Sequence, residues 1–202
     1  MGADRFARAF ALVIAAIAWI GLGIHVDAQW RLSGSLLTAL WVIGAYFTVL
    51  ANLFVAIAFT LLALRGPRGI NARLLAGITI SIALVGVVYA LLLSGLEELT
   101  AGAAVANVLL HQLTPILVPV FWVLCAPKGA LRREDPVLWL SFPAAYLAYA
   151  LVRGAAEGHF AYPFLNYVTQ GVVPVAITLL VIALAFLATG WLMVLLDRRL
   201  AR

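Results

Sequence analysis

Charged residues are scarce in this chain of 202 residues: they make up 10% of it, whereas hydrophobic residues make up 66%. A soluble domain has about a quarter of its residues charged. The composition therefore excludes an ordinary soluble fold and indicates an integral membrane protein. The net charge of +5 does not indicate a nucleic-acid partner, because the basic residues lie in short loops between apolar runs.

Cysteine and histidine are rare as well. The single cysteine, Cys125, excludes an intrachain disulfide and a thiolate metal cage. Of the three histidines, only His111 lies well inside an apolar run, whereas His25 and His159 lie nearer the ends of such runs. Electron carriers with several membrane helices hold haem between histidines of facing helices. A haem or metal protein is therefore the least favoured class, and we expect no cofactor.

Long apolar runs recur along the whole chain, separated by loops that contain Gly, Pro and charged residues. Each run is long enough to cross a bilayer as a helix. The sequence thus predicts an all-α integral membrane protein with one six-helix transmembrane domain over residues 1–202. The predicted spans are 6–26, 38–63, 72–94, 101–125, 137–152 and 168–196.

The basic residues are unevenly distributed among the loops. Only Arg31 and Arg153 of the 13 lysines and arginines lie in the first, third and fifth loops. The others lie in the second and fourth loops and near the two termini. Because basic loops stay on the cytoplasmic side, both termini are predicted to face the cytoplasm.

Two pairs of polar residues lie deep inside predicted spans. Thr48 and Asn52 are four residues apart in the second span, as are Asn107 and His111 in the fourth, so each pair shares one helix face. A polar group in hydrocarbon is costly unless it is paired, which makes such positions candidates for function. Pro115 crowds the carbonyl of His111, so the fourth helix should be distorted there.

The two pairs lie at similar predicted depths. At 1.5 Å per residue, Thr48 is about 12 Å and His111 about 15 Å from the same membrane face. A threonine hydroxyl becomes a useful nucleophile when a base such as histidine takes its proton. Asn52, Asn107 and Gln112 could then donate hydrogen bonds to an oxyanion.

Structural interpretations of the same residues remain open. Membrane threonines commonly bond a carbonyl one turn back, and membrane asparagines commonly link helices. Tyr89 is either an interface anchor or a supporting residue of the site. Arg153 is either a snorkelling side chain or a clamp for a carboxylate or phosphate. Asp27 and Glu97 are candidates to orient the His111 ring.

Several segments together resemble the bacterial branch of the androgen-induced-gene family of membrane proteins. They are "YFTVLANL", "LLHQLTPILVPVFWVL", "PKGAL", "WLSFPAAYLAYALVRG" and "YPFLNY". Animal members of that family are atypical threonine hydrolases that cleave fatty acid esters of hydroxy fatty acids. The resemblance implies that Thr48 is the nucleophile and His111 the base, and that the chain lies in a bacterial inner membrane.

The predicted function is therefore an intramembrane lipid ester hydrolase, whose partner is a membrane lipid or acyl ester. An acyltransferase is a close variant, in which a second alcohol replaces water. A membrane protein that binds a lipid or small solute without catalysis is the main alternative. The sequence leaves the oligomeric state open.

Overall fold

The computed structural model describes residues 2–95 and 101–201, and these are helical apart from short connections. Six helical segments are long and apolar enough to cross a membrane, which confirms the predicted all-α, six-span, multi-pass architecture. They are Gly2–Ser33, Phe47–Arg65, Ala72–Leu93, Gly102–Cys125, Asp135–Glu157 and Val172–Leu200.

Some of these segments consist of more than one helical element. The elements in chain order are α1 (Gly2–Ser33), α2 (Leu36–Ile43), α3 (Phe47–Arg65), α4 (Ala72–Val88), η1 (Tyr89–Leu93), α5 (Ala101–Val108), η2 (Leu109–Leu113), α6 (Thr114–Cys125), α7 (Asp135–Trp139), α8 (Ser141–Glu157), η3 (Pro163–Leu165), α9 (Tyr167–Gln170) and α10 (Val172–Leu200). η1 and η2 are single π-helical turns, and η3 is a 3₁₀ turn.

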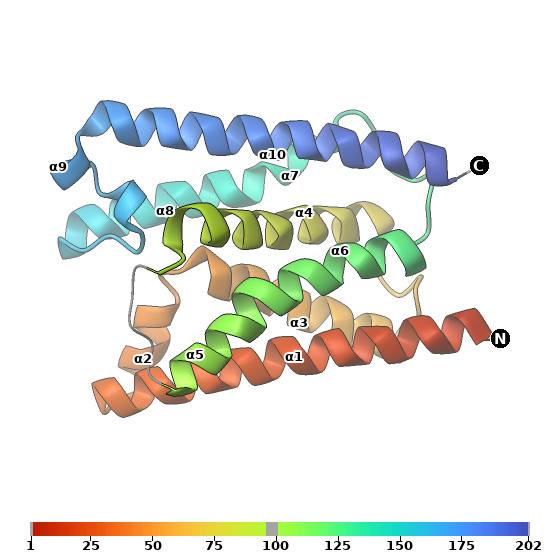
Figure 1. The fold of residues 1–202 in the computed structure, drawn as a ribbon, viewed down its shortest axis with the longest axis horizontal. Coiled ribbons are helices and arrows are strands. Elements are labelled where there is room, and N and C mark those ends of the chain that lie inside the picture. The colour runs from red at the N-terminus through yellow and green to blue at the C-terminus, as the bar shows by residue number, and fades with distance from the viewer. Residues whose placement is uncertain (1, 96–100, 202) are drawn as a thin grey trace.

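The long helices run roughly along one axis, with both chain termini at the same end of the bundle (Figure 1). We call this end the terminal end and the opposite one the far end. α1 packs along α3 and against α5 and α6, and α4 packs along α6. α8 and α10 lie on the other side of α3 and α4, and α10 contacts α4 and α7 (Figure 1).

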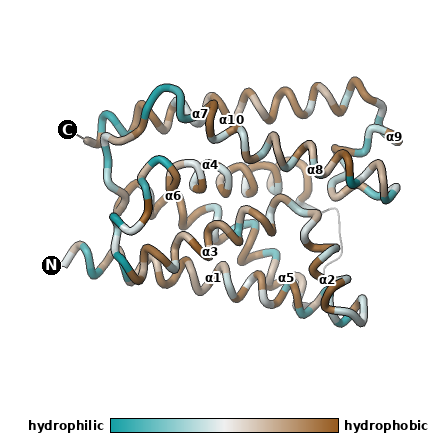
Figure 2. Tube along the Cα trace, turned by 180° about the vertical axis from the view of Figure 1, so that it is seen from behind, coloured by the Kyte–Doolittle hydropathy of each residue, from teal (hydrophilic) through white to brown (hydrophobic). Residues whose placement is uncertain are grey.

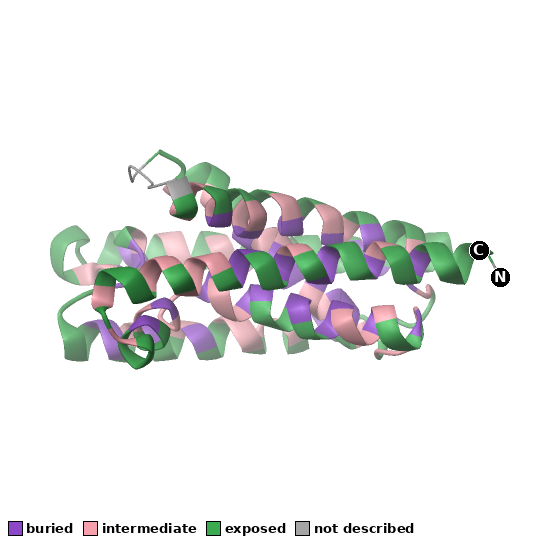
Figure 3. Cartoon of the chain, turned by 90° about the horizontal axis from the view of Figure 1, so that it is seen from below, coloured by how far each residue is buried: buried purple, intermediate pink, exposed green. Residues whose placement is uncertain are grey.

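The outward faces of the helices are exposed and apolar, whereas hydrophilic residues gather at the ends of the bundle (Figures 2 and 3). This is the pattern of a protein whose solvent is lipid. Small residues bring the helices together, as is common in membrane bundles. A Cβ at Gly21 would lie 2.6 Å from the Leu110 side chain, and one at Gly86 would lie 2.6 Å from Pro115.

The predicted second span, 38–63, is broken in the structure. α2 ends before Gly44, and Tyr46 has an extended backbone (φ −97°, ψ 130°) before α3 begins at Phe47. A continuous apolar pattern does not reveal this break, because the groups that compensate it come from α8. The ends of the other five helical segments differ from the predicted span ends by seven residues at most. The fifth segment consists of two helices, α7 and α8, which meet at Leu140, and α10 begins at Val172.

The loops at the terminal end are held by two fully buried carboxylates. Asp135 accepts hydrogen bonds from the Arg73 guanidinium and from the backbone N–H of Arg132. Asp197 of α10 accepts from the N–H groups of Gly129 and Leu131, both at 3.0 Å. These bonds fasten the connection between α6 and α7 to the helices around it.

We expect Asp135→Ala to lower the free energy of unfolding by about 2–3 kcal/mol, because Arg73 and the Arg132 N–H lose their buried acceptor. The Arg73 side chain is 31% exposed, so water compensates part of the loss. Unfolding in mixed detergent micelles measures the change. Glu134→Ala is the matched control, since its pair with Arg132 spans 3.8 Å at the surface and contributes less than about 1 kcal/mol. Equal losses in the two variants would contradict this account.

Candidate functional site

The break between α2 and α3 places Thr48 at the first turn of a helix inside the bundle. Two backbone carbonyls at the break, those of Gly44 and Ala45, accept hydrogen bonds from Tyr149 (3.2 Å) and Tyr146 (2.8 Å) of α8. Unpaired carbonyls are not tolerated in hydrocarbon, so these tyrosines make the break possible. As a result, the N–H groups at the start of α3 point into the protein.

The Thr48 hydroxyl is not bonded to a carbonyl one turn back, because the preceding turn is not helical. Its hydrogen-bonding partner is the Tyr162 hydroxyl at 3.4 Å, and the Thr48 N–H donates to the same oxygen at 3.4 Å. Threonines farther along the helices do bond back to the fourth preceding carbonyl; they are Thr60, Thr79, Thr114, Thr178 and Thr189. Thr48 is 5% exposed, so its hydroxyl is shielded from the surroundings of the protein. It also makes no hydrogen bond to a backbone carbonyl of the described residues.

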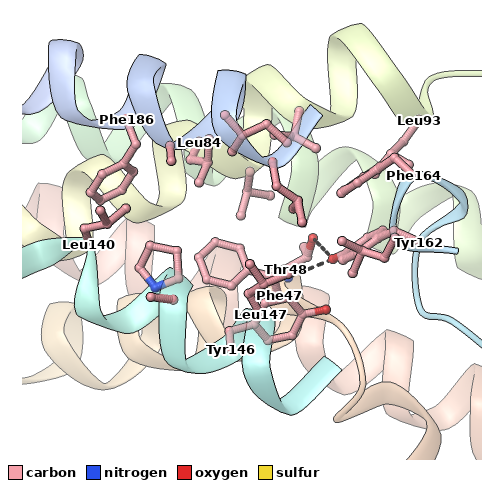
Figure 4. A pocket seen from close by; sticks show the side chains of 18 residues that line it. Phe47, Thr48, Leu84, Leu93, Leu140, Tyr146, Leu147, Tyr162, Phe164 and Phe186 are labelled. Carbon is pink, nitrogen blue, oxygen red and sulfur yellow. Dashed lines mark hydrogen bonds between the residues drawn. The ribbon is translucent and has the colours of Figure 1, made fainter. Parts of the chain in front are cut away.

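Thr48 and Tyr162 lie at one end of an apolar cavity of about 190 Å³ (Figure 4). Side chains of α3, α4, α8, α10 and the η3 region surround it. Leu140 and Phe186 close its other end (Figure 4). The only polar side chains in its described wall are Thr48, Tyr146 and Tyr162, and the Tyr146 hydroxyl already donates to the Ala45 carbonyl.

Tyr162 reaches this cavity from the loop between α8 and η3. Its ring stacks on Phe164 (centroids 5.2 Å apart, planes at 8°) and meets Tyr46 edge-on at 5.7 Å. Burial raises the pKa of the Tyr162 phenol, so the group is protonated at neutral pH. Tyr162 can therefore donate a hydrogen bond to a ligand, and it is a poor base for Thr48.

Asn52 lies one turn below Thr48 and is fully buried. Its amide nitrogen donates to the carbonyls of Thr48 (2.9 Å) and Leu110 (3.1 Å), and its oxygen accepts from Thr114 (2.7 Å). One side chain thus joins α3 to η2 and α6, so the second and fourth spans are in contact. All these bonds go to the protein, which makes Asn52 a linking residue that also fixes the start of α3.

His111 belongs to a second group of polar residues. The distortion predicted beside Pro115 is present as the π-helical turn η2, in which the Thr114 N–H bonds the Leu109 carbonyl. The His111 ring lies against Tyr89, with ring centroids 4.6 Å apart, and Asn107 donates to the Tyr89 hydroxyl at 2.6 Å. Tyr89 itself starts the π-helical turn η1, so two irregular turns face each other here.

The two groups do not meet directly. Within residues 2–95 and 101–201, no hydrogen bond joins Thr48 to His111, and His111 does not line the cavity. Its Nδ1 atom is buried and has no hydrogen-bonding partner in the part of the chain that the structure describes. The link between the groups runs through Asn52 and the carbonyl of Leu110, the neighbour of His111.

The remaining predicted residues lie apart from the cavity. Gln112 is exposed on the outer face of η2. Arg153 bonds Glu157 (2.9 Å) and Tyr149 (2.8 Å) and stacks on Trp41 at 4.2 Å, so its charge is already paired at the far end. The two residues considered for orienting His111 have other positions: Asp27 pairs with Arg31 at 2.8 Å, and Glu97 lies outside the described residues.

Sequence reasoning missed Tyr146 and Tyr162 as members of the site. Tyr146 resembles any aromatic residue of an apolar helix, and nothing in its spacing shows that it bonds a distant carbonyl. Tyr162 lies in the segment "FAYPFLNY", which has more aromatic residues than is usual for a loop. This density of rings was the one signal that could have indicated a buried loop. Their role depends on a helix break that the sequence did not predict.

No family model, curated protein or solved structure matches this chain. The resemblance to the androgen-induced-gene family therefore stays a prediction, and function has to be argued from the geometry. Among the residues that the structure describes, no three His, Cys, Asp or Glu side chains lie together as a metal site requires.

We expect Asn52→Leu to lower the free energy of unfolding by about 1–2 kcal/mol, since interhelical hydrogen bonds in membranes contribute about 0.6 kcal/mol each. Thr114→Val should cost less, because it removes one of those bonds. Thr189→Val is the matched control: its hydroxyl bonds only the Ala185 carbonyl on an exposed face. Unfolding in mixed detergent micelles distinguishes them, and an unchanged Asn52→Leu protein would refute the linking role.

Proposed function

We propose that this protein binds an acyl lipid within the membrane, with the lipid's carbonyl oxygen at Thr48 and Tyr162 and its chain in the apolar cavity. The observation that supports the proposal is the pair of hydroxyls, those of Thr48 and Tyr162, at one end of the apolar cavity. The proposed location is a bacterial inner membrane, as the family resemblance implies.

Polar contacts have to supply the selectivity of such a site. A hydrocarbon chain that moves from lipid into an apolar cavity gains no hydrophobic free energy, because both surroundings are apolar. Binding therefore depends on the oxygen atoms of the ligand. Thr48, Tyr162 and the first N–H groups of α3 together offer donors to one acceptor oxygen, and the positive end of the helix dipole favours partial negative charge there.

We expect Thr48→Val and Tyr162→Phe each to reduce the amount of acyl lipid that copurifies with the protein about tenfold, as a loss of about 1.4 kcal/mol implies. Both changes keep the shape of the side chain and remove only a hydroxyl. Native mass spectrometry of the purified protein measures the bound lipid. Thr178→Val is the control, because its hydroxyl bonds the Pro174 carbonyl on α10. Equal lipid content in all four proteins would refute the site.

Ester hydrolysis with Thr48 as nucleophile is the second candidate function. It is favoured by the Thr48 hydroxyl, which bonds the Tyr162 hydroxyl and no backbone carbonyl, and by donors placed to stabilise an oxyanion. His111 would be the base, which requires its ring to turn from Tyr89 toward the cavity. Transfer of the acyl group to another alcohol would use the same residues.

A fluorophosphonate probe tests this second function. We expect labelling of the wild-type protein and a loss of labelling in Thr48→Val and His111→Ala, with Thr178→Val labelled normally. Labelling that persists in Thr48→Val would remove this residue from the chemistry. Lipid binding without any labelling would contradict the hydrolase function and support binding without catalysis.

We also infer that the terminal end faces the cytoplasm, because most of the basic residues belong to its loops and termini. A green fluorescent protein fused after residue 202 should fluoresce, and alkaline phosphatase at the same place should be inactive. The matched control is a fusion at Ser94, which follows three spans and should give the opposite pair of results. Active phosphatase at the C-terminus would reverse the orientation.

A further inference from the structure

A small polar pocket lies at the far end of the bundle and shares no lining residue with the cavity at Thr48. Its volume is about 70 Å³, and it is enclosed by α2, the last turns of α8 and the segments that follow these two helices. Three charged or titratable side chains line it, those of Arg153, Glu157 and His159. Apart from Tyr46, its other lining residues are small or apolar. We call it the far-end pocket.

The segment "EGHF" builds one wall of this pocket. α8 ends at Glu157, because Gly158 has a left-handed backbone (φ 68°) that favours glycine. The chain then turns back, and the Phe160 ring packs on Gly154, where a Cβ would lie 2.4 Å from it. This turn places His159 in the wall of the pocket together with Glu157.

Arg153 and Glu157 form an ion pair that leaves one donor and one acceptor available. The Arg153 Nε donates to the Glu157 Oε1 at 2.9 Å, and its Nη1 donates to the Tyr149 hydroxyl at 2.8 Å. The same Oε1 accepts from the Trp41 indole N–H at 2.9 Å. The Nη2 of Arg153 and the Oε2 of Glu157 make no hydrogen bond to any described residue. Because Arg153 is only 9% exposed, a polar group in the pocket is the natural partner of its remaining N–H groups.

The opposite charges of this pair determine which kind of ligand the pocket favours. An anion would be attracted by Arg153 and repelled by Glu157, and a cation would experience the reverse. A zwitterion satisfies both residues, since its anionic group accepts from the guanidinium and its cationic group donates to the carboxylate. His159 can donate a second hydrogen bond to the anionic group.

The available acceptor favours a primary ammonium group over a trimethylammonium group. A carboxylate oxygen accepts a hydrogen bond from an N–H, which trimethylammonium lacks. Proteins hold quaternary ammonium groups against open aromatic faces instead. Here the Arg153 guanidinium stacks on Trp41 at 4.2 Å, so it already occupies that face of the indole.

The surroundings of the pocket indicate a lipid rather than a soluble ligand. The pocket lies at an end of the bundle, where hydrophilic residues meet the apolar outer faces of the helices (Figure 2). Trp41, which bonds Glu157, is 59% exposed, and Val152, next to Arg153 in sequence, is 72% exposed. Tryptophan is enriched at the level of the lipid head groups. A polar pocket beside exposed apolar side chains suits a molecule with a polar head and apolar chains.

We propose that the far-end pocket binds the head group of a zwitterionic phospholipid with a primary ammonium group, as in phosphatidylethanolamine. The phosphate accepts from the Nη2 of Arg153 and from His159, and the ammonium group donates to the Oε2 of Glu157. This site is independent of the proposed lipid site at Thr48. That site recognises an acyl carbonyl, which ester phospholipids share, whereas the far-end pocket distinguishes their head groups.

The test uses the full-length protein in detergent with phospholipids that have identical acyl chains and different head groups. Phosphatidylethanolamine, its N,N-dimethyl form, phosphatidylcholine and phosphatidylglycerol are supplied in equal amounts, and native mass spectrometry gives the bound fraction of each. We expect about tenfold more bound phosphatidylethanolamine than phosphatidylcholine, since a charge-assisted hydrogen bond is lost in the latter. The dimethyl lipid keeps one N–H group and should bind nearly as well as phosphatidylethanolamine.

Glu157→Gln separates recognition of charge from a structural role. It keeps an oxygen that can accept from Trp41 and removes the negative charge. We expect it to abolish the preference for phosphatidylethanolamine over phosphatidylcholine and to raise the bound fraction of the anionic phosphatidylglycerol about tenfold. A general loosening of the structure would not favour an anion. Arg153→Lys should lower the binding of both phosphatidylethanolamine and phosphatidylglycerol, because lysine lacks the planar fork of arginine.

Asp27→Asn is the matched control. Asp27 and Arg31 form an ion pair with the same spacing along α1, at 2.8 Å, but both side chains are exposed and neither lines the far-end pocket. Asp27→Asn should therefore leave the head-group preference unchanged. The same shift in Asp27→Asn and Glu157→Gln would overturn the inference, because it would reflect the net charge of the protein and not the pocket.

Equal binding of all four lipids by the wild-type protein would also overturn the inference. It would leave the proposed site at Thr48 intact, because that site recognises a group common to the four lipids. Glycerophosphoethanolamine, the same head group without acyl chains, distinguishes a lipid from a soluble ligand. We expect it not to displace phosphatidylethanolamine at equal concentration. Displacement would mean that the pocket binds a soluble zwitterion and would refute the assignment to a lipid.

Discussion

The helix break between α2 and α3 depends on two hydrogen bonds from α8. Inside hydrocarbon, a carbonyl that loses its helical partner needs another donor, because water is absent. Tyr146 and Tyr149 supply that donor to Ala45 and Gly44. Without them the chain would gain by continuing the helix from α2 into α3, and Thr48 would then bond a carbonyl one turn back as other threonines of this protein do.

The consequences of the break reach the whole site. Because α3 starts inside the bundle, its first N–H groups and the Thr48 hydroxyl face the apolar cavity beside Tyr162. The same two tyrosine bonds hold α8 across from α3, and side chains of both helices line the cavity.

The polar residues found by depth and spacing have different tasks. The amide nitrogen and the amide oxygen of Asn52 both bond protein partners, and these bonds hold α3 to the fourth span. Asn107 and Tyr89 bond each other next to the His111 ring, and none of the three residues lines the cavity at Thr48. Equal depth in the bilayer did not bring Thr48 and His111 together, because depth fixes one coordinate and helix rotation decides the direction of each side chain.

The amino-acid sequence by itself determined the membrane class, the six spans and the irregular turn beside Pro115. These follow from local causes: apolar length, charged loops and a proline without an N–H group. Tertiary structure alone decided the break before Thr48 and the contribution of Tyr162 to the cavity wall. Both depend on contacts between residues about 100 to 115 positions apart, and such contacts leave no mark in the spacing of any one helix.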